Sequence, residues 1–93
     1  MKNVIQTVTQ HRRYSEAAWD AAIATDDQNS GFAADRDACS EAYDRALAEL
    51  AEGNFDAAIS ALEDAAWLEK QAGDDSDAQS AILAVLEAWR ASI

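Results

Sequence analysis

The sequence predicts an all-α protein, a compact bundle of about four antiparallel helices with a tight helical hairpin at its centre. Proline is absent from the 93 residues, and glycine occurs only at Gly31, Gly53 and Gly73. Glycine commonly ends helices, so these positions divide the chain into long helical segments. Alanine, the strongest helix former, supplies 23 residues. The length fits one domain, residues 1–93.

The first helix is predicted over about residues 3–25. Apolar residues recur there near helical spacing: Ile5, Val8, Trp19, Ala22 and Ile23. His11, Arg12 and Ser15 interrupt this stripe. The polar segment 25–31 that follows is the clearest loop in the chain.

The second and third helices are predicted over about 33–52 and 55–72. Gly53 is suited to end the second helix, and Asn54 to cap the third. The predicted inward faces hold Cys39, Tyr43, Ala46, Leu47 and Leu50, then Phe55, Ala58, Ile59, Leu62, Ala65 and Ala66.

The fourth helix is predicted to open at Ser76, with Gln79 three residues later in a capping-box pattern. Its apolar stripe is the most regular in the chain: Ala78, Ile82, Val85, Leu86, Trp89 and Ile93. Short turns between four such helices favour an antiparallel bundle.

Residues 48–65 resemble the central part of a tetratricopeptide repeat. Gly53, Phe55, Ala58, Leu62 and Ala65 occupy the turn and crossing positions of that family. Three-helix domains of the microtubule-interacting-and-trafficking type have a similar turn. The resemblance covers one hairpin, and no second copy of the motif appears. It implies an adaptor or scaffold that binds a peptide or helix through apolar residues.

Charge is the strongest functional signal. Eighteen acidic residues and seven Lys or Arg give a formal net charge of −11. Residues 1–13 are a basic arm or the start of the first helix, with a charge of +3, and residues 14–93 form an acidic body with −14. This field repels nucleic acid and anionic membranes, so neither is expected as a direct ligand. A protein with a basic surface is the expected partner.

The predicted partner-binding residues are carboxylates on outer faces of the second and third helices. Those on the second helix are spaced about 4.5–6 Å along its axis, loosely similar to the phosphate spacing of about 3.4 Å along a DNA strand. The candidates are Asp37, Glu41, Asp44, Glu52, Asp56, Glu63 and Asp64. An acidic face that serves only solubility is the alternative interpretation.

No catalytic set, resident metal or cofactor is predicted. His11 is the only histidine and is expected to be exposed, whereas Cys39 is expected to be a buried, unreactive thiol. The carboxylates are expected on outward faces. The segment from Asp26 to Asp37 matches a calcium-binding EF-hand loop only in part, because Gln28 and Asp37 depart from the pattern.

Two further expectations concern association and location. Trp19 and Trp67 fit an inward face poorly, and an exposed tryptophan would be a candidate interface residue. The limited core makes a homodimer plausible. One cysteine and no long apolar run favour a cytoplasmic protein, in the host-cell cytoplasm if phage-encoded.

The leading functional hypothesis is a non-enzymatic inhibitor that blocks the basic surface of a nucleic-acid-handling protein, with mimicry of DNA as its specific form. In size and charge the chain is similar to phage-encoded inhibitors of host defence, including anti-CRISPR proteins. The alternatives are the adaptor or homodimeric scaffold described above, and a metal sensor that uses the segment from Asp26 to Asp37.

Overall fold

The computed structural model describes residues 2–25 and 31–92, which form four α-helices and no strand. These are α1 (Lys2–Thr25), α2 (Phe32–Ala51), α3 (Phe55–Gln71) and α4 (Ser76–Ser92). The predicted all-α class and the four helices are confirmed, with boundaries within about two residues of those expected. The basic residues near the N-terminus belong to the first turns of α1 rather than to a separate arm.

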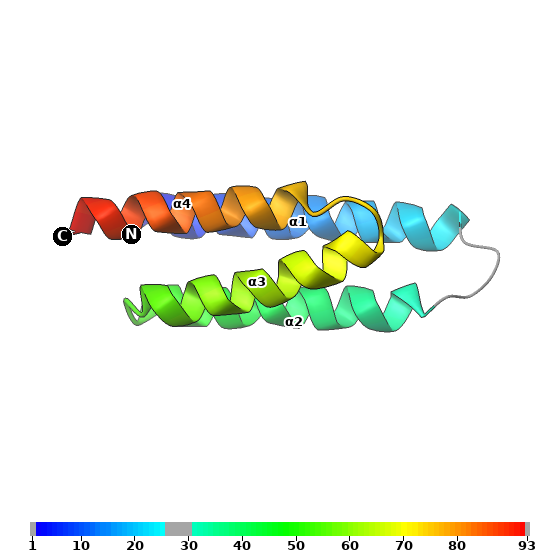
Figure 1. Cartoon of the computed structure of the whole chain (residues 1–93), viewed down its shortest axis with the longest axis horizontal. Coiled ribbons are helices and arrows are strands. Elements are labelled where there is room, and N and C mark those ends of the chain that lie inside the picture. The colour runs from blue at the N-terminus through cyan, green and yellow to red at the C-terminus, as the bar shows by residue number, and fades with distance from the viewer. Residues whose placement is uncertain (1, 26–30, 93) are drawn as a thin grey trace.

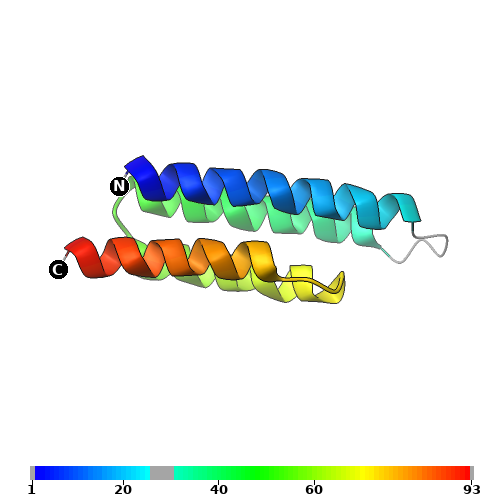
Figure 2. The same cartoon turned by 90° about the horizontal axis from the view of Figure 1, so that it is seen from above.

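The helices run alternately up and down along one long axis (Figures 1 and 2). Each helix packs against its neighbour in sequence, and α4 also packs against α1, which closes the four helices into a ring. The bundle measures 48 × 16 × 15 Å. Both ends of the chain lie at the same end of the bundle (Figure 1).

The core is narrow because alanine fills much of it. Eight of the buried residues are alanines, which let the helix backbones approach closely. The largest fully buried side chains are Tyr43, Leu50, Leu62, Val8, Val85 and Cys39. Phe32, Phe55, Ile59 and Ile82 are half-buried against this core.

The turn between α2 and α3 has the predicted glycine geometry. Gly53 has a φ of +79°, a left-handed conformation that side chains disfavour. The Gly53 N–H donates to the Leu50 carbonyl and the Asn54 N–H donates to the Glu49 carbonyl, which together make a Schellman motif. The Asn54 side chain does not cap α3 as expected, because its amide donates to the carboxylates of Glu49 and Glu52.

The start of α4 differs in detail from the predicted capping box. Ser76 is already helical, and its N–H donates to the Asp74 carboxylate at 2.9 Å. The Gln79 side chain donates to the Asp75 carboxylate, one residue before the helix. An acidic residue therefore replaces Ser76 as the acceptor at this helix start, where the helix dipole favours negative charge.

The calcium-loop hypothesis falls mainly on residues 26–30, which lie outside the described part of the chain. Among the described residues, no helix combines the length and the apolar character needed to cross a membrane.

Candidate functional site

All seven predicted partner-binding carboxylates are exposed. Glu41 and Glu63 form no ion pair among the described residues. Three others have an arginine partner: Asp37 with Arg36, Asp44 with Arg12 and Asp64 with Arg45, at distances of 2.9–3.4 Å. The predicted exposure of these carboxylates is therefore confirmed, but the paired arginines weaken the negative electrostatic field around α1 and α2.

The seven carboxylates do not form one continuous ladder. Asp44 contacts Arg12 of α1, so it lies on the α1 side of α2. Asp64 contacts Arg45 and lies over the groove between α2 and α3. Asp56 lies at the end of the bundle, beside Trp89 of α4. Negative charge therefore covers several sides of the bundle.

The charge is divided unequally between the two halves of the bundle. The described residues of α1 and α2, 2–25 and 31–51, hold seven acidic residues and five basic ones, a net charge of −2. Residues 52–92, which include α3 and α4, hold nine acidic residues and two basic ones, a net charge of −7. The strongest negative field is therefore expected on the α3–α4 half.

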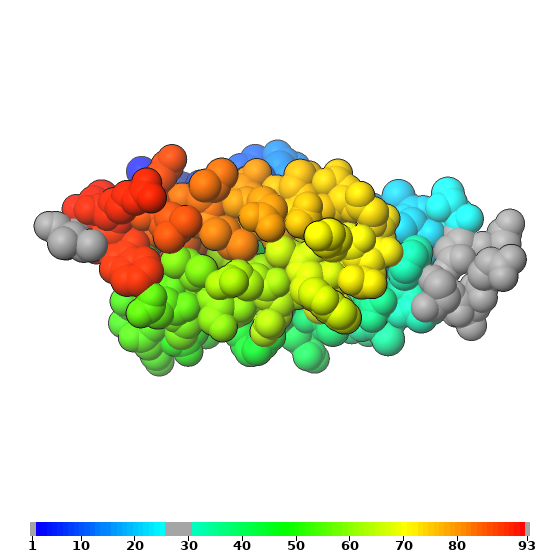
Figure 3. All heavy atoms as spheres, in the orientation of Figure 1, coloured from blue at the N-terminus to red at the C-terminus, as the bar shows by residue number. Residues whose placement is uncertain are grey.

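Two large apolar side chains are exposed on that same half. Trp67 of α3 is 64% exposed and Leu83 of α4 is 60% exposed. Phe55 stacks on Trp89 where α3 meets α4, with ring centroids 6.2 Å apart. An α-helix turns by about 100° per residue. On this basis Trp67 lies about 120° around α3 from Phe55, and Leu83 about 120° around α4 from Trp89, so both side chains point away from the stacked rings. Figure 3 views the side of the molecule on which α3 and α4 lie in front.

A buried polar cluster joins all four helices and was not predicted. Glu69 of α3 is only 3% exposed. Its carboxylate accepts hydrogen bonds from the Tyr43 hydroxyl of α2 at 2.6 Å and from the Ser15 hydroxyl of α1 at 2.8 Å. The backbone N–H of Ala78 in α4 donates to the second carboxylate oxygen at 3.2 Å. This carboxylate therefore fixes the four helices relative to one another.

Burial dominates the protonation of this cluster. Loss of solvation raises the pKa of Glu69, although the hydrogen bonds from Tyr43, Ser15 and Ala78 oppose that shift. Burial and the neighbouring carboxylate raise the pKa of Tyr43 as well, so its hydroxyl remains a donor. The Cys39 thiol lies 3.8 Å from the Glu69 oxygen that also accepts from Tyr43 and Ser15. Burial raises the pKa of this thiol. The predicted buried cysteine is confirmed.

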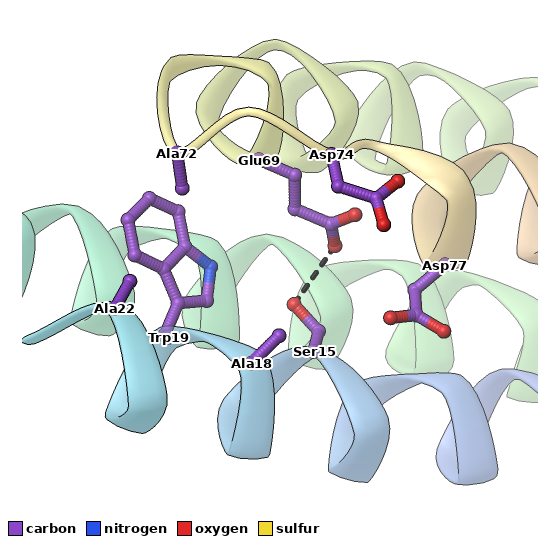
Figure 4. Close-up of a pocket in the computed structure, with 8 residues that line it drawn as sticks. All are labelled: Ser15, Ala18, Trp19, Ala22, Glu69, Ala72, Asp74 and Asp77. Carbon is purple, nitrogen blue, oxygen red and sulfur yellow. Dashed lines mark hydrogen bonds between the residues drawn. The ribbon is translucent and has the colours of Figure 1, made fainter. Parts of the chain in front are cut away.

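A small pocket lies beside Glu69 (Figure 4). Its volume is about 60 Å³, enough for a few water molecules at about 10–15 Å³ each. Its lining comprises Ser15, Ala18, Trp19, Ala22, Glu69, Ala72, Asp74 and Asp77. The indole N–H of Trp19 is buried without a hydrogen-bond partner among the described residues.

The expectation that His11 is exposed is wrong. Its ring is half-buried, and Nδ1 lies 3.1 Å from a carboxylate oxygen of Asp77 in α4. The ring of Tyr14 packs edge-on against it, with centroids 5.8 Å apart. The histidine thus links α1 to α4 one helical turn from Ser15.

The expectation that the carboxylates face outward fails at Glu69, although the sequence held a signal for it. Glu69 continues the spacing of Leu62, Ala65 and Ala66, so it falls on the inward stripe of α3. His11 and Ser15, which interrupt the apolar stripe of α1, face polar partners on α3 and α4. The polar Glu69 on the inward stripe of α3 is thus paired with the polar Ser15 on the inward stripe of α1.

Within residues 2–25 and 31–92, no three His, Cys, Asp or Glu side chains are grouped so that they could hold a metal ion. The chain matches no protein family model, no curated protein and no solved structure.

Proposed function

We propose that this protein is a non-enzymatic inhibitor that binds and blocks the basic surface of a nucleic-acid-handling protein. The observation that carries the proposal is the excess of acidic residues in 52–92, a segment with a formal net charge of −7 in which every carboxylate except that of Glu69 is at least partly exposed. Such a surface attracts a basic protein and speeds its association. In size and charge the chain resembles the anti-CRISPR type of phage inhibitor, which would act in the host-cell cytoplasm.

Mimicry of DNA is the specific form of the proposal. Asp37, Glu41 and Asp44 are exposed along one rigid helix, about 4.5–6 Å apart along its axis. A basic groove that holds phosphates about 3.4 Å apart along a strand could accept carboxylates carried on such a rod. Rigidity supports this role, because an ordered helix loses little conformational entropy when it binds.

The buried cluster supports binding rather than catalysis. The Glu69 carboxylate already accepts hydrogen bonds from Ser15, Tyr43 and Ala78 within the bundle, so its oxygens are committed to joining helices. The pocket beside it, at about 60 Å³, is far smaller than the roughly 300–1,000 Å³ of ordinary ligand sites.

A second candidate function is that of an adaptor that uses the hairpin of α2 and α3. The exposed Trp67 on α3 favours this function, because an adaptor would bind through apolar side chains. The inner face of this hairpin is not an open groove, because α1 and α4 cover it and Tyr43, Leu50 and Leu62 are fully buried. An adaptor would therefore bind through its outer surface. Strong salt dependence would distinguish the inhibitor from an adaptor that binds mainly through apolar residues.

The test begins with affinity capture from cell lysate, followed by binding measurements on the purified captured protein. Affinity for an electrostatic partner should fall steeply between about 50 mM and 300 mM salt. The double variant Glu41→Lys with Glu63→Lys should weaken binding at least about tenfold, because it reverses two exposed charges. These positions are preferable to Asp37 and Asp44, whose reversal would also break ion pairs with arginine.

The matched control is Glu41→Asp with Glu63→Asp, which changes the same positions and keeps the charge. This control should bind like the wild type. Binding that is insensitive both to salt and to charge reversal would contradict the proposal.

A further inference from the structure

Two arginines lie in the seam between α1 and α2, and each is held between two carboxylates. Arg12 of α1 lies 3.2 Å from Glu16 on its own helix and 2.9 Å from Asp44 of α2. Its guanidinium faces both oxygens of Asp44, since Nε is close to one and Nη2 lies 3.5 Å from the other. This two-nitrogen geometry is the one in which arginine recognises carboxylates and phosphates most specifically.

Arg36 of α2 occupies a similar position further along the seam. Its Nε lies 2.7 Å from a carboxylate oxygen of Asp20 in α1, and its Nη1 lies 3.4 Å from a carboxylate oxygen of Asp37 in α2. Each arginine is thus shared between one carboxylate of α1 and one of α2. The seam therefore contains two places where a guanidinium sits between paired carboxylates.

The ion pairs of Arg12 are only partly open to water. The side chain of Arg12 is 27% exposed and that of Glu16 is 30% exposed. The Ser40 hydroxyl of α2 donates to the Glu16 carboxylate at 3.1 Å, so both helices hold this carboxylate in place. Partial burial reduces screening of an ion pair by water and salt. Arg12 therefore neutralises Asp44 more persistently than a freely moving surface arginine would.

These arginines hold two of the three carboxylates on which the proposed mimicry of DNA depends. Asp37 and Asp44 are paired, whereas Glu41 between them is exposed and has no ion pair among the described residues. A basic partner can engage Asp44 fully only by competing with Arg12 for it. The guanidinium that already lies there indicates which kind of cation the position accepts.

We infer that Arg12 is an intramolecular competitor of the partner protein, and that an arginine side chain of the partner takes its place on Asp44 and Glu16. This inference rests on the proposed function and identifies the cation that the partner offers as a guanidinium. Lysine is a poorer replacement, because its ammonium is a compact charge that cannot face both carboxylate oxygens at once. Arg12 thus lowers the affinity for basic surfaces that offer only ammonium groups.

Labelled oligo-arginine and oligo-lysine peptides of about eight residues test the inference on the full chain. Binding is measured by fluorescence polarisation at about 20 mM salt, where exposed charges are weakly screened. The variants compared are Arg12→Gln and its matched control Arg13→Gln. Arg13 is exposed and forms no ion pair among the described residues. Both variants remove one positive charge from the same turn of α1, so they differ mainly in the local contact.

Arg12→Gln should bind oligo-arginine at least about threefold more tightly than Arg13→Gln does, because only the former frees Asp44 and Glu16. The increase should be smaller for oligo-lysine. The double variant Arg12→Gln with Asp44→Asn should lose the increase, because the freed carboxylate is gone. Circular dichroism establishes that each variant is folded. If Arg12→Gln does not fold, Arg12→Lys takes its place and should show part of the increase, since a lysine cannot face both oxygens of Asp44.

Equal affinity of Arg12→Gln and Arg13→Gln for oligo-arginine would overturn the inference, because net charge alone would then set the affinity. An equal increase for both peptides would overturn the assignment of a guanidinium, and absence of binding by either peptide would overturn the inference as a whole. The proposed function is tested separately, by charge reversal at Glu41 and Glu63 with the captured protein, and it would survive each of these results.

Discussion

The Tyr43 hydroxyl donates a 2.6 Å hydrogen bond to the Glu69 carboxylate inside the bundle. Tyr43 is fully buried on α2 and Glu69 is 3% exposed on α3. Hydrogen bonds to charged acceptors are short and strong, and a carboxylate left without its donors is costly to bury. This contact is therefore expected to be important for the stability of the fold.

Removing the tyrosine hydroxyl tests this expectation. Tyr43→Phe should lower the free energy of unfolding by about 1–3 kcal/mol, because the buried carboxylate loses a donor while the ring still fills the core. Urea denaturation followed by circular dichroism measures the change. Tyr14→Phe, at an exposed position, should shift the free energy by less than about 0.5 kcal/mol. Equal effects of the two variants would show that the Glu69 contact contributes nothing special.

The pH dependence of stability should report the protonation of Glu69. Because the pKa of Glu69 is raised in the folded state, the folded protein holds this proton more tightly than the unfolded chain does. Its contribution to stability is therefore fully present below the unfolded pKa and is lost as pH rises through the folded pKa. Glu69→Gln, which cannot ionise, should lack this loss.

The difference in melting temperature between Glu69→Gln and the wild type isolates this group from the other carboxylates. The difference should move in favour of the variant as pH rises from about 4 to about 8. The matched control is Glu63→Gln, which changes an exposed carboxylate on the same helix. A difference for Glu69→Gln that stays constant with pH would contradict the assignment.

Truncation of the leucines should separate core from surface. Leu50 is fully buried and Leu83 is 60% exposed. Leu50→Ala should destabilise the protein by about 2–5 kcal/mol, because it leaves a cavity in a core with few large side chains. Leu83→Ala should change stability by less than about 0.5 kcal/mol. Chemical denaturation of both variants provides the comparison, and a large loss of stability for Leu83→Ala would assign Leu83 to the core instead of the surface.

The Cys39 thiol should be protected in the folded protein. It is buried among Ser15, Ala65 and Glu69, and burial raises its pKa, so the reactive thiolate is scarce. A thiol-reactive dye should label the native protein far more slowly than the protein in guanidinium chloride. Rapid labelling of the native state would show that the interior around Cys39 opens readily.

The fold was predictable from the sequence because its signals are local. The absence of proline and the positions of Gly53 and Gly73 fixed the helix ends, and the apolar spacing in α2, α3 and α4 identified the inward faces. The details of the caps at Asn54 and Ser76 were not predicted. Several carboxylate acceptors lie near each of these positions, and only the three-dimensional structure shows which of them accepts the hydrogen bond.

The buried polar cluster around Glu69 could not be predicted from local sequence patterns. The pairs Ser15 with Glu69 and His11 with Asp77 join residues 54 and 66 positions apart. No local pattern links such residues, and an abundance of other carboxylates concealed Glu69. Exposure of the predicted acidic residues was predictable from helical periodicity, but their partial pairing with Arg12, Arg36 and Arg45 depends on how the helices pack.

Competition with nucleic acid tests the central claim most directly, because an inhibitor of this kind must occupy a surface that nucleic acid also binds. The protein, immobilised with its captured partner, is challenged with increasing concentrations of duplex DNA at fixed ionic strength. The proposal predicts that DNA releases the partner in proportion to the DNA's own affinity for it, and that Glu41→Lys with Glu63→Lys lowers the DNA concentration needed. Retention of the partner at saturating DNA would contradict the proposal.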